Sequence, residues 1–233
     1  MIIEQTLIQH TIIDKLSAIA NILISNKSQK NIGFLSGAIG EAFFLFHYDR
    51  AVDYPSAYNR GIELIENVFE TINNGHLYHT YCTGLAGIGW AIEHLVDNNF
   101  IDYDIKESLN EIDDLVGAMM IKDMENGNYD YLHGASGSVL YLLKRRKSNP
   151  IKIDNYIKNY LEVLEETAVT ANNNALKWRS IIDSKTQKVG YNISLSHGIS
   201  SIIIVLSKLY SNGIETERTM KLAEKSVSYS PST

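Results

Sequence analysis

The hydrophobic residues of this chain fall into two kinds of segment, which alternate along its length. Segments of the first kind are mostly apolar, and each follows a pair of glycines or a glycine and a serine, at 42–46, 88–92, 139–143 and 202–206. Segments of the second kind carry one apolar stripe at steps of three and four, at 56–72, 104–122 and 155–171. A helix that is apolar all round lies in an interior, whereas a helix with one apolar stripe is half exposed. The pattern therefore predicts two concentric layers of helices.

Local propensity agrees with this prediction in most places. One more helix is expected ahead of the first apolar segment, because apolar residues recur at helical spacing at Ile8, Ile12, Leu16, Ile19 and Leu23. Residues 202–205 are all β-branched and would favour a strand on their own. We predict a helix there because the segment aligns with three others that are expected to be helical.

The segments are framed by a sequence repeat that occurs four times. Its copies lie at 35–40, 82–87, 132–137 and 196–201, and their lead glycines are Gly37, Gly84, Gly134 and Gly198. The lead glycines are 47, 50 and 64 residues apart, which leaves room for one helix outward and one helix back. We predict four helical hairpins whose glycine loops share one end of a ring. Paired glycines let two backbones approach closely; a phosphate-binding loop is less favoured, because no lysine follows any pair.

The longest step in the repeat coincides with a break in the helical pattern. Residues 172–193 lack helical spacing, and within them 177–182 and 189–193 can pair as a short hairpin around 184–187. We predict that 172–193 is an irregular insertion between two helical hairpins. Such a loop is either an excursion over the surface or a segment that faces a substrate.

Composition limits the organisation and the surroundings of the protein. The 233 residues are 45% hydrophobic with three prolines and no linker-like stretch, so we expect a single domain over 1–233. No apolar run has the length needed to cross a bilayer, and the N-terminus lacks the pattern of a signal peptide. The single cysteine, Cys82, excludes an internal disulfide. These features indicate a cytoplasmic protein without a membrane span.

Charge gives little sign of a nucleic-acid partner. The formal net charge is −6, and the basic residues cluster only at Lys144, Arg145, Arg146 and Lys147. That run falls at the end of a predicted helix, so we expect its side chains to be solvated and to compensate the helix dipole. We expect no binding to nucleic acid.

The repeat also brings candidate chemistry to one place. If the glycine loops share one end of the ring, the residues before each lead glycine face a common cavity, and these are Ser36, Thr83, His133 and His197. Asp130 lies four residues before the third lead glycine and joins them. Imidazoles can carry protons near neutral pH, and a carboxylate beside one can orient it. Each histidine can also be a structural residue that caps a helix or bonds in the core.

A second candidate set consists of His76, His79 and Cys82, which follow one another at steps of three. Nitrogen and sulfur ligands suit zinc, and on a continuous helix this spacing would place them on one side. The surrounding residues, however, are typical of a loop. We keep this set only as a weak alternative metal site.

Three features taken together resemble the lanthionine synthetase C-like proteins, the cyclases that form thioether rings in lanthipeptides. They are the Gly-x-x-Gly helical repeat, the segment Tyr-Asp-Tyr-Leu-His-Gly-Ala-Ser-Gly at 129–137, and the segment Ser-Leu-Ser-His-Gly-Ile at 194–199. Their order and spacing carry the likeness over nearly the whole chain. The resemblance implies an all-α fold, an α/α toroid of seven hairpins, of which this chain would hold the N-terminal four.

The resemblance also implies a reaction. Family members bind a zinc ion that activates a cysteine thiol of a dehydrated precursor peptide, and the thiolate adds to dehydroalanine or dehydrobutyrine. Asp130 matches the active-site aspartate of the family and His197 its active-site histidine. His133 stands where the family usually has other residues, and the repeat alone makes it an additional cavity candidate. The implied partners are the precursor peptide and a dehydratase and transporter complex.

The chain departs from the family in ways that qualify this expectation. The family's zinc ligands are two cysteines and a histidine in later hairpins, and no residue here matches them. Ser201 replaces the second glycine of the fourth pair. Four hairpins cannot close a ring, so the first and last should expose apolar flanks. We expect an N-terminal fragment of a cyclase that is inactive alone and lacks the metal at the family position.

Two other functions fit the same pattern. A non-catalytic module derived from the toroid would hold a peptide or a partner protein in its open groove. A glycosidase on an α/α toroid would need two carboxylates facing each other across the cavity. Only Asp130 lies at a predicted mouth, whereas Glu41 and Glu93 fall within predicted helices.

Overall fold

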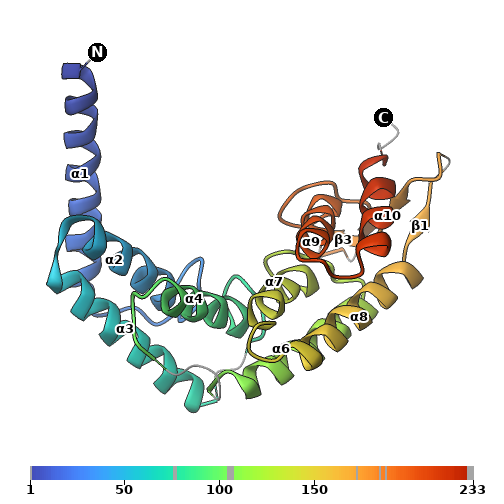
Figure 1. Ribbon diagram of the computed structural model, residues 1–233, viewed down its shortest axis with the longest axis horizontal. Coiled ribbons are helices and arrows are strands. Elements are labelled where there is room, and N and C mark those ends of the chain that lie inside the picture. The colour runs from blue at the N-terminus through green and yellow to red at the C-terminus, as the bar shows by residue number, and fades with distance from the viewer. Residues whose placement is uncertain are drawn as a thin grey trace.

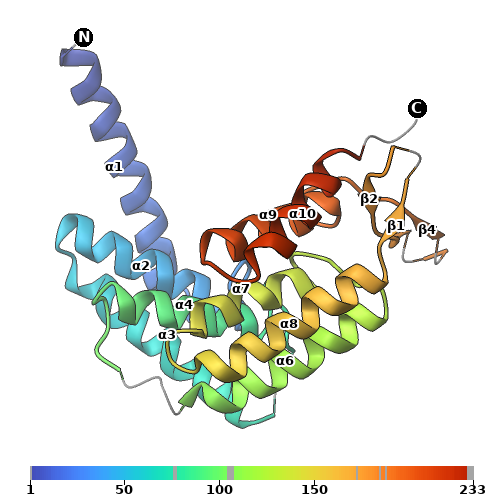
Figure 2. The ribbon, with the colours of Figure 1, turned by 45° about the vertical axis from the view of Figure 1, so that its right-hand side comes forward.

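The protein forms an open arch of helices (Figure 1). The computed structural model describes residues 2–75, 78–103, 108–171, 173–183, 185–186 and 188–229, with side chains from His10 onward. The concave side is built by α2, α4, α7 and α9, and the convex side by α3, α6 and α8, as both ribbon views show (Figures 1 and 2). The expected all-α toroid is confirmed, as an arc of two helical layers.

The helices of the concave layer each begin directly after a lead glycine. They are α2 (Ala38–Val52), α4 (Leu85–Asp97), α7 (Ala135–Arg145) and α9 (Ile199–Ser211). The β-branched segment that would have favoured a strand lies within α9, because it packs in the same buried layer as the other three. Tertiary context here outweighs local propensity.

The helices of the convex layer follow the amphipathic segments. They are α3 (Pro55–Asn73), α6 (Asn110–Glu125) and α8 (Pro150–Glu166), and a further helix, α10 (Thr216–Val227), packs against α9. The segment expected at 155–171 stops at Glu166, since the chain turns at Thr167 into a strand. Residues 104–107 of the segment expected at 104–122 lie outside the described residues. A continuous set of buried apolar side chains fills the space between the two layers.

Each concave helix starts with the same backbone contact. The residue after the lead glycine donates its N–H to the carbonyl seven residues before it: Ala38 to Asn31, Leu85 to Tyr78, Ala135 to Asn128 and Ile199 to Asn192, at 2.7–3.1 Å. A Cβ on the lead glycine would lie 2.1–2.7 Å from that same carbonyl oxygen. The glycine is therefore needed for close approach, since its backbone is extended in all four loops.

The helix N-termini are consequently already occupied. Their first amides bond to loop carbonyls, and the next position is also used: Ile39 and Ala86 donate from the backbone, and Ser136 and Ser200 from the side chain, to the carbonyl seven residues earlier. The backbone contacts, one in each repeat and a second in the first two repeats, satisfy donors that a phosphate would otherwise bind.

The helix α1 (Ile2–Ser25) extends away from the arch (Figure 1). It is joined to α2 by a hydrogen bond between the Ser17 and Tyr48 hydroxyls at 2.8 Å. Its apolar stripe is covered only in part: Ile12 and Ile19 are 51% and 45% exposed, whereas Leu16 and Leu23 pack against the core. Among the described helices, none is both long and apolar enough to cross a bilayer.

Two small hairpins connect α8 to α9. The expected one consists of β3 (Ser180–Asp183) and β4 (Lys188–Gly190), which pair antiparallel. The sequence does not predict the other, β1 (Val169–Thr170) with β2 (Leu176–Lys177), because apolar residues keep helical spacing through Ala168. Figure 2 shows both hairpins beyond the end of α8.

The basic run at the end of α7 corrects our expectation of four solvated side chains. Arg145 has no exposed side-chain surface, and it bonds with its Nε to Asp113 of α6 at 3.0 Å and with Nη1 to Glu93 of α4. Both carboxylates are fully buried, and the Tyr141 hydroxyl donates to Asp113 as well. Arg145 therefore ties α4, α6 and α7 together inside the arch.

The other members of the run pair at the surface. Lys144 and Lys147 contact Asp97 of α4, and Arg146 contacts Asp154 of α8. The sequence does not separate these roles, because four consecutive basic residues point to different sides of a helix and their pattern does not mark the buried side.

Replacing Arg145 with Met should destabilise the fold strongly. Asp113 would lose its counter-charge, and Glu93 would keep only that of the half-exposed Lys147, whose Nζ lies 3.2 Å from Oε2. Breaking a buried pair in this way costs about 3–5 kcal/mol. Arg146→Met, one residue along the same helix, removes only a half-exposed pair and should cost less than about 1 kcal/mol. Urea unfolding followed by circular dichroism measures both, and equal losses for the two variants would contradict the role given to Arg145.

Candidate functional site

The four glycine loops are joined in series by backbone hydrogen bonds. Leu35 N–H donates to the Cys82 carbonyl at 3.0 Å, and Cys82 N–H donates to the Leu132 carbonyl at 2.9 Å. Tyr131 N–H then donates to the Ser196 carbonyl at 3.1 Å. Neighbouring repeats therefore meet through their loops, which places the loop residues of the third and fourth repeats next to each other.

Asp130 and His197 form a pair at this junction. One carboxylate oxygen of Asp130, Oδ2, contacts His197 Nδ1. The other, Oδ1, accepts the backbone N–H groups of Leu132 at 2.7 Å and His133 at 2.8 Å. His197 N–H in turn donates to Ser194 Oγ at 3.1 Å. The carboxylate is thus fixed by its own loop, and it fixes the imidazole of the next repeat.

His133 lies beside this pair. Its ring is nearly parallel to that of His197, with an angle of 11° between the planes and 6.5 Å between the centroids. The side chain is exposed. Of the four residues that precede lead glycines, His133 and His197 are brought to a shared cavity, whereas Thr83 bonds to Thr80 within its own loop.

The cavity has a volume of about 430 Å³. Its described walls come from the loop before α7, from strand β3 and from the loop before α9: Asn126, Gly127, Asn128, Tyr129, Asp130, His133, Ser180, Ile181, Ile182, Asn192 and His197. Asp130 is the one carboxylate in this set. Its partner side chain, His197, remains 49% exposed, so a molecule in the cavity can reach the imidazole.

The sequence left two alternatives for the 172–193 insertion, an excursion over the surface or a segment that faces a substrate, and the position of β3 in the cavity wall fits the second. A loop of this length indicates a functional segment in general terms, but nothing in its composition shows which residues meet the glycine loops. The structure does so because Trp178, which is 2% exposed, donates from Nε1 to the Leu164 carbonyl of α8 at 2.8 Å and fixes the start of the hairpin.

The carboxylates considered for glycosidase chemistry lie elsewhere. Glu93 is buried against Arg145, and Glu41 accepts a hydrogen bond from Gln29 at 2.6 Å. Neither is among the described residues that line the cavity with Asp130. A pair of facing carboxylates is therefore not formed in this cavity by the described part of the chain.

Comparison with known proteins identifies the family of this chain. The family model described as lanthionine synthetase C-like protein matches residues 11–232. The chain belongs to this family. The solved structure of nisin cyclase aligns with it at a TM-score of 0.62 and 16% identity, over 94% of this chain and 56% of nisin cyclase. The present chain thus spans just over half of that protein. At this identity the likeness establishes the fold; a comparison with curated proteins gives no match.

The residues of this lanthionine synthetase C-like chain do not fit the zinc site that the family resemblance implies. The chain has one cysteine, and no three His, Cys, Asp or Glu side chains in the described ranges are grouped to hold a metal ion. Burial, with a smaller contribution from the Asp130 charge, raises the pKa of the Cys82 thiol. A zinc ligand requires the thiolate, so this environment works against metal binding.

The weak alternative metal set is only partly visible. His76 lies outside the described residues. His79 Nε2 contacts Asp123 Oδ2 at 2.7 Å, and both side chains are about 15% exposed. Asp123 also accepts from the Asn128 side chain at 3.1 Å, so this pair connects the second glycine loop to the start of the third.

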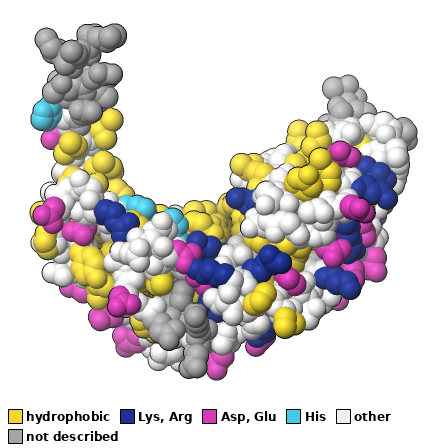
Figure 3. Space-filling model, viewed as in Figure 1, with side chains coloured by type: hydrophobic (Ala, Val, Ile, Leu, Met, Phe, Trp, Pro, Cys, Tyr) yellow, Lys and Arg dark blue, Asp and Glu magenta, His cyan; other side chains and the backbone are white. Residues whose placement is uncertain are grey.

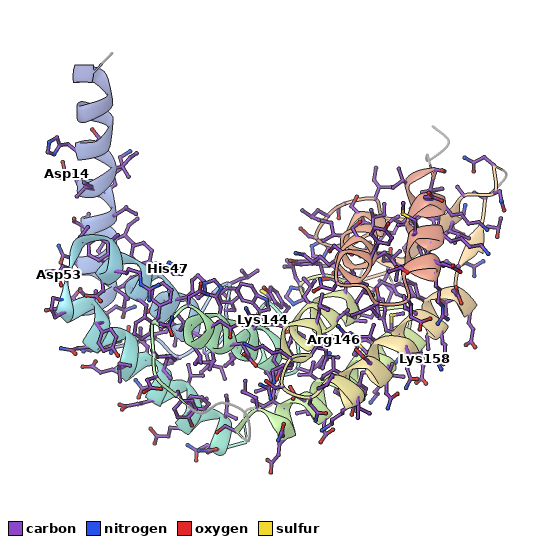
Figure 4. All side chains as sticks on the ribbon, viewed as in Figure 1. Asp14, His47, Asp53, Lys144, Arg146 and Lys158 are labelled. Carbon is purple, nitrogen blue, oxygen red and sulfur yellow. The ribbon has the colours of Figure 1, made fainter. Side chains whose placement is uncertain are left out.

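A second cluster, which the sequence did not reveal, lies on the concave side of the arch. Figure 3 shows histidine and hydrophobic side chains there, and Figure 4 places His47 on this side. His47 and His94 lie 5.6 Å apart between ring centroids, among Phe43, Trp90 and Phe100. Burial lowers the pKa of both histidines, helped by the charges of Arg50 and Lys144 respectively. The contacts join α2 to α4.

Neutralising Asp130 should make Cys82 more reactive. Removal of the nearby negative charge lowers the pKa of the thiol, which raises the thiolate fraction and the alkylation rate. We expect faster reaction of Asp130→Asn with iodoacetamide at pH 8. Asp123→Asn, which removes a carboxylate that does not act on Cys82, should react like the unmodified chain. The rates are followed by mass spectrometry, and a slower Asp130→Asn reaction would refute the electrostatic account.

The His47–His94 cluster should make the fold sensitive to acid. Both pKa values are lowered on folding, so the unfolded chain binds more protons and stability falls as pH drops below about 6.5, the unfolded value. We expect the double variant His47→Gln, His94→Gln to lose part of this dependence between pH 7.5 and 5.5. Thermal unfolding at several pH values measures it, with His10→Gln on the exposed part of α1 as the control.

Proposed function

We propose that this chain supplies the acid–base pair of a peptide cyclase that adds cysteine thiols to dehydroalanine or dehydrobutyrine. The observation that carries the proposal is the contact between Asp130 and His197, from two repeats, in one open cavity. Family membership supports the choice of reaction. The proposed substrate is a dehydrated precursor peptide, and a separate dehydratase would prepare it by removing water from its serine and threonine residues.

The geometry supports different tasks for the two residues. Asp130 is held by two backbone amides, and it occupies the Nδ1 side of the His197 ring. The ring nitrogen left for a substrate is therefore Nε2. A carboxylate in this position orients the imidazole and stabilises it when it is protonated, as in other His–Asp pairs. Asp130 is a positioning residue, and His197 is the group that meets the substrate.

The reaction needs the transfer of a single proton. The thiol gives its proton to His197 Nε2, and the sulfur forms a bond with the β-carbon of the dehydrated residue. The electrons of the carbon–carbon double bond move toward the carbonyl, and the resulting enolate takes the proton back from the imidazolium at the α-carbon. One C–S bond forms and no other reactant is consumed. General acid–base catalysis of this kind contributes about 10²–10⁴-fold.

Ring formation should depend on His197 and Asp130 in the intact protein. We expect His197→Asn to lower kcat by about 100-fold or more, and Asp130→Asn to lower it as well by freeing the imidazole. His79→Asn is the matched control, because it removes a histidine from another His–Asp pair outside the cavity. Loss of free thiol and thioether formation are followed by mass spectrometry on a synthetic peptide with one cysteine and one dehydroalanine.

The same experiment separates the proposal from a binding module. Unchanged ring formation in His197→Asn would remove this residue from the mechanism. Peptide binding without ring formation in any variant, including the unmodified intact protein, would favour a module that holds a peptide in the groove.

A further inference from the structure

Strand β3 brings two consecutive apolar side chains to the candidate site. Ile181 and Ile182 both line the cavity that contains Asp130 and His197. They are 53% and 44% exposed, although β-branched apolar residues are usually covered. These two side chains therefore form an open apolar wall beside a polar one.

A bulge in the hairpin accounts for this arrangement. Successive residues of a regular strand point to opposite faces. Here Ile181 pairs with Val189 and Asp183 pairs with Lys188, so the register shifts and Ile182 is the extra residue between them. An extra residue bends the strand and redirects side chains, and such bulges are frequent next to active sites. Both isoleucines consequently reach one cavity.

The position of Ile182 is further set by Gly190 on the paired strand. A Cβ added at Gly190 would lie 2.7 Å from Ile182 Cδ1. The missing side chain thus leaves space for Ile182 to lie over β4. The hairpin itself is fixed to α8 through the Trp178 side chain. The apolar wall is accordingly held in place without a bound molecule.

The charges of the cavity indicate what would occupy this wall. The described lining residues include Asp130, which is already paired with His197, and they include no lysine or arginine. Among these described residues, no lysine, arginine or unpaired carboxylate is left to select a charged side chain. An apolar side chain bound there would instead remove the isoleucines from water. Burial of this kind stabilises a complex by about 0.8 kcal/mol per buried methylene group.

We propose that Ile181 and Ile182 form a subsite for an apolar residue of the substrate peptide, adjacent to the cysteine that reacts at His197. The inference rests on the proposed function, because that function makes the occupant a peptide. It adds a preference: peptides with a leucine or a similar residue next to the cysteine bind better than those with a polar residue there. Ile181 and Ile182 determine specificity and take no part in proton transfer.

Binding of two short synthetic peptides tests the subsite. The peptides differ only in having Leu or Ser beside a single cysteine, and their affinities are measured by isothermal titration calorimetry. We expect the intact protein to prefer the Leu peptide, and Ile181→Ser or Ile182→Ser to reduce that preference by about tenfold. Val189→Ser changes a 57% exposed residue of the same hairpin that is not among the cavity residues, and should leave the preference intact.

Gly190→Ala gives an independent variant that keeps both isoleucines. Its Cβ displaces Ile182, so we expect a smaller loss of the Leu preference than in Ile182→Ser. Circular dichroism and thermal unfolding verify that each variant is folded. The proposal is overturned if the intact protein shows no preference for the Leu peptide, or if the folded isoleucine variants keep it.

The binding measurement is independent of the reaction. If His197→Asn forms rings normally while the isoleucine variants lose the Leu preference, the proposed catalytic role fails and the subsite stands. If His197→Asn stops ring formation while the preference is unchanged in Ile181→Ser and Ile182→Ser, the subsite fails and the catalytic role stands.

Discussion

The contact between each lead glycine and the carbonyl six residues before it is the constraint on which the arch depends. In all four repeats the missing side chain lets that carbonyl approach, and the same oxygen accepts the N–H of the next residue. This contact folds the loop back over the helix start and satisfies amides that would otherwise be left without partners. It also leaves the loop edge free to bond with the loop of the neighbouring repeat. The same contact therefore shapes each helix start and allows neighbouring repeats to join.

The candidate site follows from this series of loops. Asp130 and His197 are 67 residues apart in sequence, and they meet because the loops of repeats three and four are joined by the Tyr131–Ser196 hydrogen bond. Deeper in the arch, the Arg145 contacts with Glu93 and Asp113 hold the helices behind these loops. A buried ionic group of this kind is weak support for stability in itself, yet it sets the relative positions of three helices whose apolar surfaces would allow some sliding.

The sequence predicted the features that repeat, and it missed several that occur once. The helix starts, the two layers and the neighbouring positions of His133 and His197 all follow from aligning four glycine loops. The burial of Arg145 occurs in one repeat only, and within a basic run it cannot be told from its solvated neighbours. The same is true of Ile181 and Ile182, whose place in the cavity depends on a one-residue bulge. Register within a short hairpin is decided by tertiary contacts such as that of Trp178, which no local pattern encodes.

Two His–Asp pairs, one between a glycine loop and α6 and one between two glycine loops, show why residue type alone does not identify a site. His79 with Asp123 and His197 with Asp130 use the same groups. In the first pair both side chains are about 15% exposed, and Asp123 also accepts a hydrogen bond from the Asn128 side chain. This pair therefore links two loops. In the second pair the carboxylate is held by its loop while the imidazole is half exposed beside a cavity. A proton carrier needs one fixed partner and one accessible nitrogen, and only the second pair combines these two conditions. The difference lies in the distance from the lead glycine: His197 directly precedes Gly198 at the loop edge, whereas His79 precedes Gly84 by five residues and turns toward α6.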